Sequence, residues 1–279
     1  MSTGVYRRIG WHGANFSPRI KKVTLNILSY KKIGTGYPLV LIHGYLGGQS
    51  MWKFQEEELK NYYDLIMPSL AGYGESSHMI APSTIEENAK QVFELLDFLK
   101  IDKFNLLGHS MGGMIVQEMA VVNPERINKL ICFGTGSIGL LPNRFETIEE
   151  SRTKIKKFGL NTVISEIAKT WFVDYLIGEG YQLCLDEGKK TSTQAALASL
   201  DAWERWDGRE RLKHIKCPTL IVWSNKDRSY DWKQQQILKE GIVNSRMEII
   251  ANCAHNSNME KPILFNKVVK NFLSTINNL

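Results

Sequence analysis

Short apolar runs alternate along the chain with longer segments whose apolar residues recur at helical spacing. Residues 39–42 form an uninterrupted apolar run, which is typical of a strand buried on both faces. Further short strands are expected at residues 22–30, 63–67, 104–107, 130–133, 219–223 and 247–250, and helices at 85–99, 114–122 and 263–276. This alternation predicts an α/β fold with a mostly parallel central sheet and helices on both faces.

One segment breaks the alternation. Residues 137–212 have a helical pattern, are rich in aromatic side chains and contain no convincing strand. We interpret them as a helical cap or lid over the carboxyl ends of the strands, where large aromatic side chains can wall a ligand site. The core domain then comprises residues 1–136 and 213–279. The alternative is that these helices simply pack onto the main domain.

The first candidate for chemistry is the sequence Gly108-His109-Ser110-Met111-Gly112. A G-x-S-x-G pattern recurs by chance, but here an apolar strand precedes it and an apolar helix follows it, as a nucleophile elbow requires. The turn is strained at the serine, so the residues two before and two after it must be small. Ser110 is therefore the candidate nucleophile, and the alternative is a serine that caps the helix.

A serine hydroxyl needs a base, and the base needs a partner that fixes its tautomer. His255 follows the last expected strand, and a loop at that end of a parallel sheet can reach the elbow. Asp227 follows the strand at 219–223, so the chain order is Ser110, Asp227, His255, the order of this hydrolase architecture. Asp231 is the rival carboxylate, but we expect it to begin the next helix as a cap. His109 is expected to pack rather than to transfer protons.

A glycine-rich turn after the strand at 39–42 supplies candidate donors for an oxyanion hole. The turn reads His43-Gly44-Tyr45-Leu46, and a backbone N–H there can point at a developing negative charge. We expect the donors to be the backbone N–H groups of Tyr45 and Met111, with Leu46 in reserve. His43 is expected to hold this turn by hydrogen bonds.

Composition and charge exclude several classes of protein. The chain has 279 residues, 43% of them hydrophobic and 23% charged, close to the globular average. The formal net charge of +6 is scattered and no nucleic-acid motif occurs, so nucleic-acid binding is not expected. No apolar run approaches the ~18 residues of a membrane helix. The four cysteines show no metal-ligand spacing, which predicts reduced thiols in a cytoplasmic protein without a metal or other cofactor.

Together these motifs resemble those of the α/β-hydrolase superfamily over nearly the whole chain. Residues 72–76, Gly-Tyr-Gly-Glu-Ser, are similar to that superfamily's G-x-G-x-S loop, although Ser69 stands where many members carry aspartate. Within the superfamily, residues 151–160 and 227–229 and the pair Trp171-Phe172 are similar to the 3-oxoadipate enol-lactonases. The candidate substrate-binding residues are Leu46, Trp171 and Phe172.

The resemblance and the motifs together imply a serine hydrolase of the carboxylesterase or lactonase type. Its expected partner is a small-molecule ester or lactone, cleaved through an acyl-enzyme intermediate. The sequence leaves two alternatives open. One is a hydrolase that cleaves carbon–carbon bonds with the same triad, and the other is a small-molecule receptor that keeps the triad and turns over very slowly.

Overall fold

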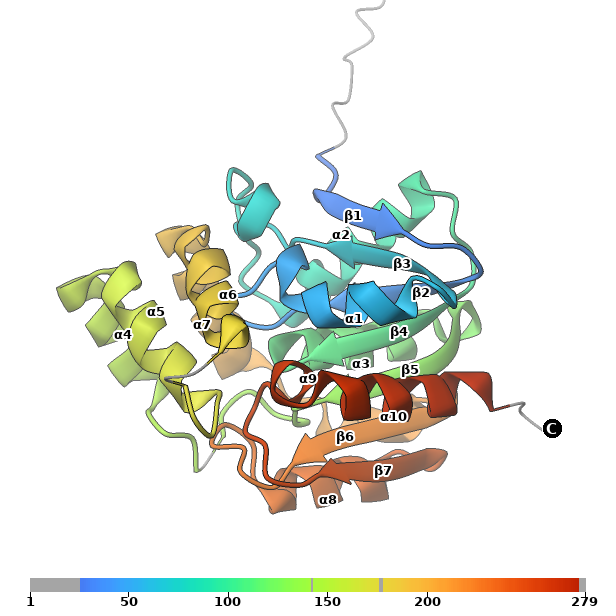
Figure 1. Ribbon diagram of the computed structural model, residues 1–279. Coiled ribbons are helices and arrows are strands. Elements are labelled where there is room, and N and C mark those ends of the chain that lie inside the picture. Colours follow the sequence, from blue (N-terminus) through green and yellow to red (C-terminus); the bar gives the residue numbers. More distant parts are fainter. Residues whose placement is uncertain (1–25, 142, 176–177, 276–279) are drawn as a thin grey trace, which may run out of the picture.

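The computed structural model describes residues 26–141, 143–175 and 178–275, and it is built around a seven-stranded sheet (Figure 1). The strand order is β1-β3-β2-β4-β5-β6-β7, and every neighbouring pair is parallel except β1 with β3. The strands are β1 (Tyr30–Ile33), β2 (Tyr37–Ile42), β3 (Tyr63–Pro68), β4 (Phe104–His109), β5 (Ile127–Phe133), β6 (Thr219–Ser224) and β7 (Ser245–Ile250). The expected fold class is confirmed.

Helices cover both faces of this sheet, as the apolar strands require. The side chains of β2 show the division, because Leu39 and Leu41 belong to one apolar cluster while Val40 and Ile42 belong to another. The first cluster includes α1 (Lys53–Leu59) and α10 (Pro262–Ser274), and the second includes α2 (Ile85–Phe98), α3 (Met111–Val122) and α8 (Trp232–Gly241). The shorter helices are η1 (Gln49–Trp52), η2 (Gly74–Ser76), η3 (Pro124–Arg126), η4 (Arg209–His214) and α9 (Ser257–Glu260).

The first strand differs from the sequence-based expectation. Part of the expected strand at 22–30 lies outside the described residues, and the strand that forms, β1, begins only at Tyr30, which pairs with Pro68 of β3. The N–H of Ser29 donates instead to the side-chain hydroxyl of Ser76 at 2.8 Å. The pairing of β1 with β3 therefore begins at Tyr30. The alternation of apolar residues did not indicate this starting point.

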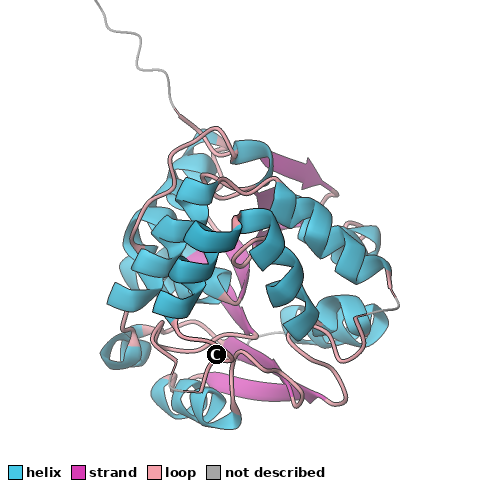
Figure 2. Cartoon of the chain, turned by 90° about the vertical axis from the view of Figure 1, so that its left-hand side faces the viewer, coloured by secondary structure: helices cyan, strands magenta, loops and turns pink. Residues whose placement is uncertain are grey.

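In the described part of residues 137–212, which we call the cap, four α-helices lie between β5 and β6. They are α4 (Ile148–Phe158), α5 (Leu160–Thr170), α6 (Glu179–Lys189) and α7 (Thr193–Arg205). These helices lie beyond the carboxyl ends of the parallel strands and in front of the sheet when viewed from that side (Figures 1 and 2). An isolated bridge between Ile138 and Asp207 joins the two ends of the segment. The cap is thus positioned over the strand ends that carry the candidate chemistry.

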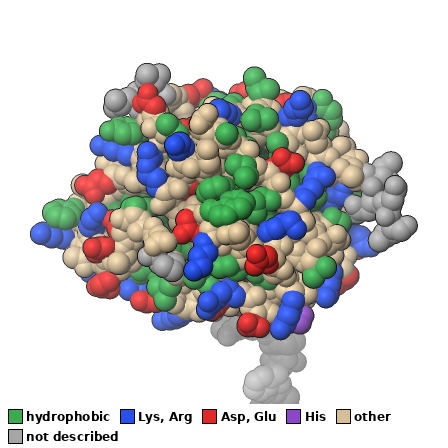
Figure 3. Space-filling view, turned by 90° about the horizontal axis from the view of Figure 1, so that it is seen from below, with side chains coloured by type: hydrophobic (Ala, Val, Ile, Leu, Met, Phe, Trp, Pro, Cys, Tyr) green, Lys and Arg blue, Asp and Glu red, His purple; other side chains and the backbone are tan. Residues whose placement is uncertain are grey.

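The surface agrees with the even spread of charge in the sequence. On the face shown in Figure 3, basic and acidic side chains are interspersed and surround a small apolar patch. Among the helices of the described ranges, none has both the length and the apolar composition needed to cross a membrane.

Candidate active site

Ser110 occupies a strained turn between β4 and α3. Its backbone has φ 56° and ψ −118°, a conformation with positive φ that residues other than glycine rarely adopt. The flanking glycines make this turn possible, since a Cβ on Gly108 would lie 2.2 Å from the Gly112 carbonyl oxygen, and one on Gly112 would lie 2.3 Å from the Ile42 carbonyl oxygen. The strand, turn and helix therefore have the form of a nucleophile elbow.

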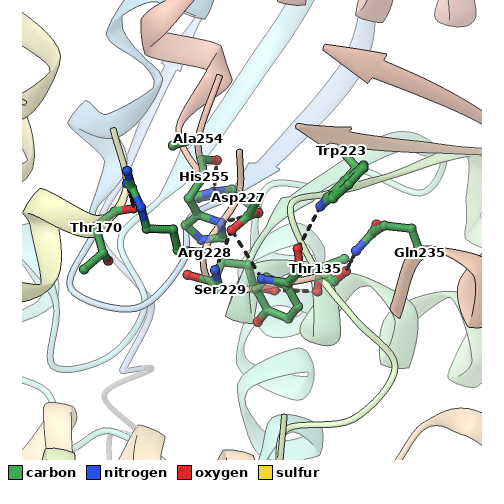
Figure 4. A network of polar contacts seen from close by, with 12 residues as sticks. Thr135, Thr170, Trp223, Asp227, Arg228, Ser229, Gln235, Ala254 and His255 are labelled. Atoms are coloured by element: carbon green, nitrogen blue, oxygen red, sulfur yellow. Dashed lines mark hydrogen bonds and ion pairs between the residues drawn. The ribbon is translucent and has the colours of Figure 1, made fainter. Parts of the chain in front are cut away.

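His255 and Asp227 are hydrogen-bonded to each other at the ends of neighbouring strands. His255 Nδ1 lies 2.9 Å from Asp227 Oδ2, and both side chains are almost completely buried (Figure 4). The other carboxylate oxygen, Oδ1, accepts from the backbone N–H of Ser229 at 2.7 Å and of Tyr230 at 3.2 Å. The carboxylate is thus held from both sides. The rival, Asp231, caps α8 by accepting from Gln234 N–H at 3.0 Å, as expected.

Ser110 and His255 line the same pocket beneath the cap. Because His255 Nδ1 is engaged by Asp227, Nε2 is the nitrogen that can face the serine hydroxyl. The Tyr230 ring stacks on the His255 ring, with centroids 5.7 Å apart. Burial raises the pKa of Tyr230 to about 12, and hydrogen bonds to Ser110 and Thr135 oppose that rise. The three candidate residues therefore lie in one buried, polar cluster.

His109 packs against His255, a contact that the sequence did not indicate. Its ring stacks on Phe133 and is tilted against His255, with both centroid distances 4.5 Å. Its Nε2–H donates to the His255 carbonyl oxygen at 3.3 Å, and burial lowers the pKa of His109 well below its ordinary value. A neutral His109 thus connects the elbow to the loop that carries His255.

The turn after β2 lies directly against Ser110. A Cβ on Gly44 would be 2.9 Å from Ser110 Cβ, so only glycine permits this approach. The N–H of Tyr45 donates to no acceptor within the described part of the chain, and the N–H of Met111 is in the first turn of α3, where no intrahelical acceptor exists. His43 holds the turn, since its Nδ1–H donates to the Gly44 carbonyl oxygen at 2.8 Å and its Nε2 accepts from Leu70 N–H at 2.9 Å.

The pocket is narrow and most of its wall comes from the cap. Its lining residues are Tyr45, Ser110, Gly139, Leu141, Arg144, Phe145, Ile167, Trp171, Trp203, Ser229, Tyr230 and His255. The cavity is about 20 Å³, room for about one water molecule. Of the three expected substrate-binding residues, Trp171 lines this pocket. Leu46 and Phe172 are buried but are not part of its lining.

The pocket residues that the sequence did not identify include Arg144, Tyr230 and Trp203. Tyr230 lies three residues after Asp227, and this spacing is the one signal that could have suggested it. Arg144 lies in an irregular segment before α4, where no periodicity indicates which way a side chain points. The folded cap brings Arg144 and Trp203 to the candidate site, whereas Tyr230 comes from the loop between β6 and α8.

The described residues contain no cluster of histidine, cysteine and carboxylate side chains that could hold a metal ion. The four cysteines are free thiols, and all are buried. Burial raises the pKa of Cys184 and of Cys132, which keeps both thiols protonated.

Comparisons with known proteins agree with this geometry. The family described as "alpha/beta hydrolase fold" matches residues 37–162. A putative carbamate hydrolase RutD of Azorhizobium caulinodans is 27% identical over 89% of this chain and 96% of its own length. 3-Oxoadipate enol-lactonase 2 of Acinetobacter baylyi is 28% identical, with 90% of this chain and 94% of the relative covered.

A third relative is named for a different substrate. It is a 2-hydroxy-6-oxononadienedioate/2-hydroxy-6-oxononatrienedioate hydrolase of Pseudomonas putida, 29% identical over 91% of this chain and 94% of its own. The solved enol-lactonase of Burkholderia xenovorans LB400 superposes with a TM-score of 0.82 at 24% identity, covering 89% of this chain and 96% of that one. The sheet order, the elbow and these matches lead to one conclusion: the chain has the alpha/beta hydrolase fold and is similar over most of its length to hydrolases that share it.

Proposed function

We propose that this protein is a serine hydrolase that cleaves a small carboxylic ester or lactone through an acyl-enzyme intermediate. The observation that carries the proposal is the buried His255–Asp227 hydrogen bond in the pocket that Ser110 also lines. A relative named as an enol-lactonase supports the substrate class. The pocket lies under the cap, which supplies most of its wall.

The proposed reaction uses each residue in one role. Ser110 Oγ attacks the substrate carbonyl carbon while His255 Nε2 accepts the hydroxyl proton, and Asp227 stabilises the charged imidazole. The N–H groups of Tyr45 and Met111 stabilise the oxyanion, each contributing about 3 kcal/mol in sites of this kind. His255 then protonates the leaving alcohol and, in deacylation, takes a proton from the attacking water.

The direct test is the Ser110→Ala variant assayed with 4-nitrophenyl butyrate. We expect kcat/KM to fall by at least about 10³-fold, since removing the nucleophile disables the triad as a unit. Ser165→Ala is the matched control and should keep full activity, because the Ser165 hydroxyl donates to the Thr162 carbonyl oxygen within α5 and does not line the pocket. The melting temperature of each variant shows whether it is folded. A folded Ser110→Ala protein with wild-type turnover would refute the proposal.

A second candidate reaction is hydrolysis of a carbon–carbon bond next to a ketone, which the Pseudomonas putida relative favours. The same triad can serve both reactions, so only a comparison of substrates can distinguish between them. We propose comparing kcat/KM for short esters and lactones with kcat/KM for a vinylogous 1,5-diketone, and including an O-alkyl carbamate because of the carbamate hydrolase relative. A strong preference for the diketone would favour the second candidate.

A further inference from the structure

Arg144 is a partly buried cation in the pocket, and it pairs with no carboxylate of the described residues. Its side chain lines the same cavity as Ser110 and His255. Among the described residues no aspartate or glutamate oxygen forms an ion pair with it, and the residues outside the described ranges include neither amino acid. Glu146 is near enough to act on its charge but pairs with Lys154 at 2.6 Å and with Ser151. The hydrogen bond that Arg144 makes, to Ser151 Oγ, is long at 3.5 Å.

A second arginine of the cap shows what a paired guanidinium looks like in this protein. Arg152 contacts the carboxylates of Glu149, Asp201 and Glu204 at 3.1, 2.8 and 2.6 Å. These hydrogen bonds raise the pKa of Arg152, whereas burial lowers the pKa of Arg144. Arg152 joins α4 to α7, while Arg144 has lost water without gaining an equivalent counter-charge.

Two further donors without partners lie beside Arg144. The Oη of Tyr45 and the Nε1 of Trp203 are buried and make no hydrogen bond with the described residues. The Trp203 ring is in contact with both neighbours, since the Arg144 guanidinium lies 4.9 Å from its centroid and the Tyr45 ring centroid is also 4.9 Å away. Three donors with unused capacity thus gather on the cap side of the pocket, where each one costs stability unless an acceptor reaches it.

We propose that Arg144, Tyr45 Oη and Trp203 Nε1 form a subsite for a free carboxylate group of the substrate, separate from the ester or lactone group that is cleaved. This inference rests on the proposed function, and it narrows the substrate class to small esters or lactones that carry a free carboxylate. The aromatic faces of Trp203 and Phe145 keep the guanidinium in place, and its fork can bind a carboxylate with two hydrogen bonds.

The test compares two esters of similar length, mono-4-nitrophenyl adipate and 4-nitrophenyl heptanoate. We expect wild-type protein to prefer the adipate ester, and Arg144→Gln to lower the ratio of the two kcat/KM values by about 10- to 100-fold, the value of a hydrogen-bonded charge pair. Arg144→Lys, which keeps the charge without the fork, should retain part of the preference. Arg209→Gln is the matched control, because Arg209 is exposed and paired with Asp207, and it should not change the ratio.

A binding measurement keeps the result independent of turnover. Free adipate should raise the melting temperature of wild-type protein and of Ser110→Ala, but not that of Arg144→Gln, because a ligand stabilises only the state that binds it. An unchanged ester ratio in folded Arg144→Gln, or an equal adipate shift in all variants, would overturn the subsite and leave Arg144 as a structural residue of the cap. If instead Ser110→Ala keeps its activity while adipate still binds through Arg144, the proposed reaction fails and the subsite stands.

Discussion

Replacing His43 by glutamine should reduce the loss in free energy of unfolding that occurs when the pH is lowered from 7.5 to 5. His43 is completely buried, and burial lowers its pKa from 6.5 to about 4. In the unfolded chain His43 therefore binds a proton near pH 6.5, whereas in the folded protein it binds that proton only near pH 4. The stability that neutral His43 contributes is complete above pH 6.5 and is lost as the pH falls toward 4. Between pH 7.5 and pH 5, these two pKa values correspond to a loss of about 2 kcal/mol.

Urea unfolding at pH 7.5, 6 and 5 measures this loss directly. Glutamine does not titrate but can still accept the Leu70 N–H, so His43→Gln should lose about 2 kcal/mol less than the wild type over this range. His109 also has a lowered pKa, and because burial, its main cause, is the same in both proteins, most of its contribution cancels in the difference. His78→Gln, at an exposed site, is the control and should follow the wild type. Parallel pH profiles for wild type and His43→Gln would refute the reasoning.

Two more predictions concern the triad. Asp227→Asn should lower kcat by about 10⁴-fold, because an amide in place of the acceptor favours the wrong tautomer of His255. Steady-state hydrolysis of 4-nitrophenyl butyrate measures this, and a loss below about 10-fold would mean that another group orients the imidazole. Ser110→Gly should be more stable than Ser110→Ala by about 1 kcal/mol, because glycine alone adopts φ 56° without strain. Urea unfolding compares the two, and equal stabilities would show that the turn stores no strain.

The fold, and the placement of the candidate residues Ser110, Asp227 and His255 at one edge of the sheet, were predictable because each depends on short-range rules. The run at residues 39–42 had the character of a buried strand and lies in the centre of the sheet as β2. The turn at Ser110 requires glycine on both sides because it leaves no room for a side chain there, and this steric limit holds wherever such a turn occurs. Asp227 and His255 follow two strands that lie side by side, and the carboxyl ends of parallel strands share one edge.

The pocket wall was not predictable in the same way. Tyr45, Arg144 and Trp203 come from a turn after β2, an irregular segment and a cap helix, and they meet only through the packing of the cap. Whether an aromatic residue of the cap faces the pocket or the core depends on how helices rotate against each other, which one sequence does not encode locally. Trp171 lines the pocket and the adjacent Phe172 does not, although both are apolar and buried.

The small size of the cavity has a kinetic consequence. Because the cavity has space for about one water molecule, no ester can enter unless the aromatic side chains that line it first move away from Ser110 and His255. Admission and release then carry barriers of their own, separate from the chemistry of bond breaking. Two substrates with equally reactive carbonyl groups can therefore differ in turnover according to how far each one displaces the lining side chains, Trp171 and Tyr230 among them.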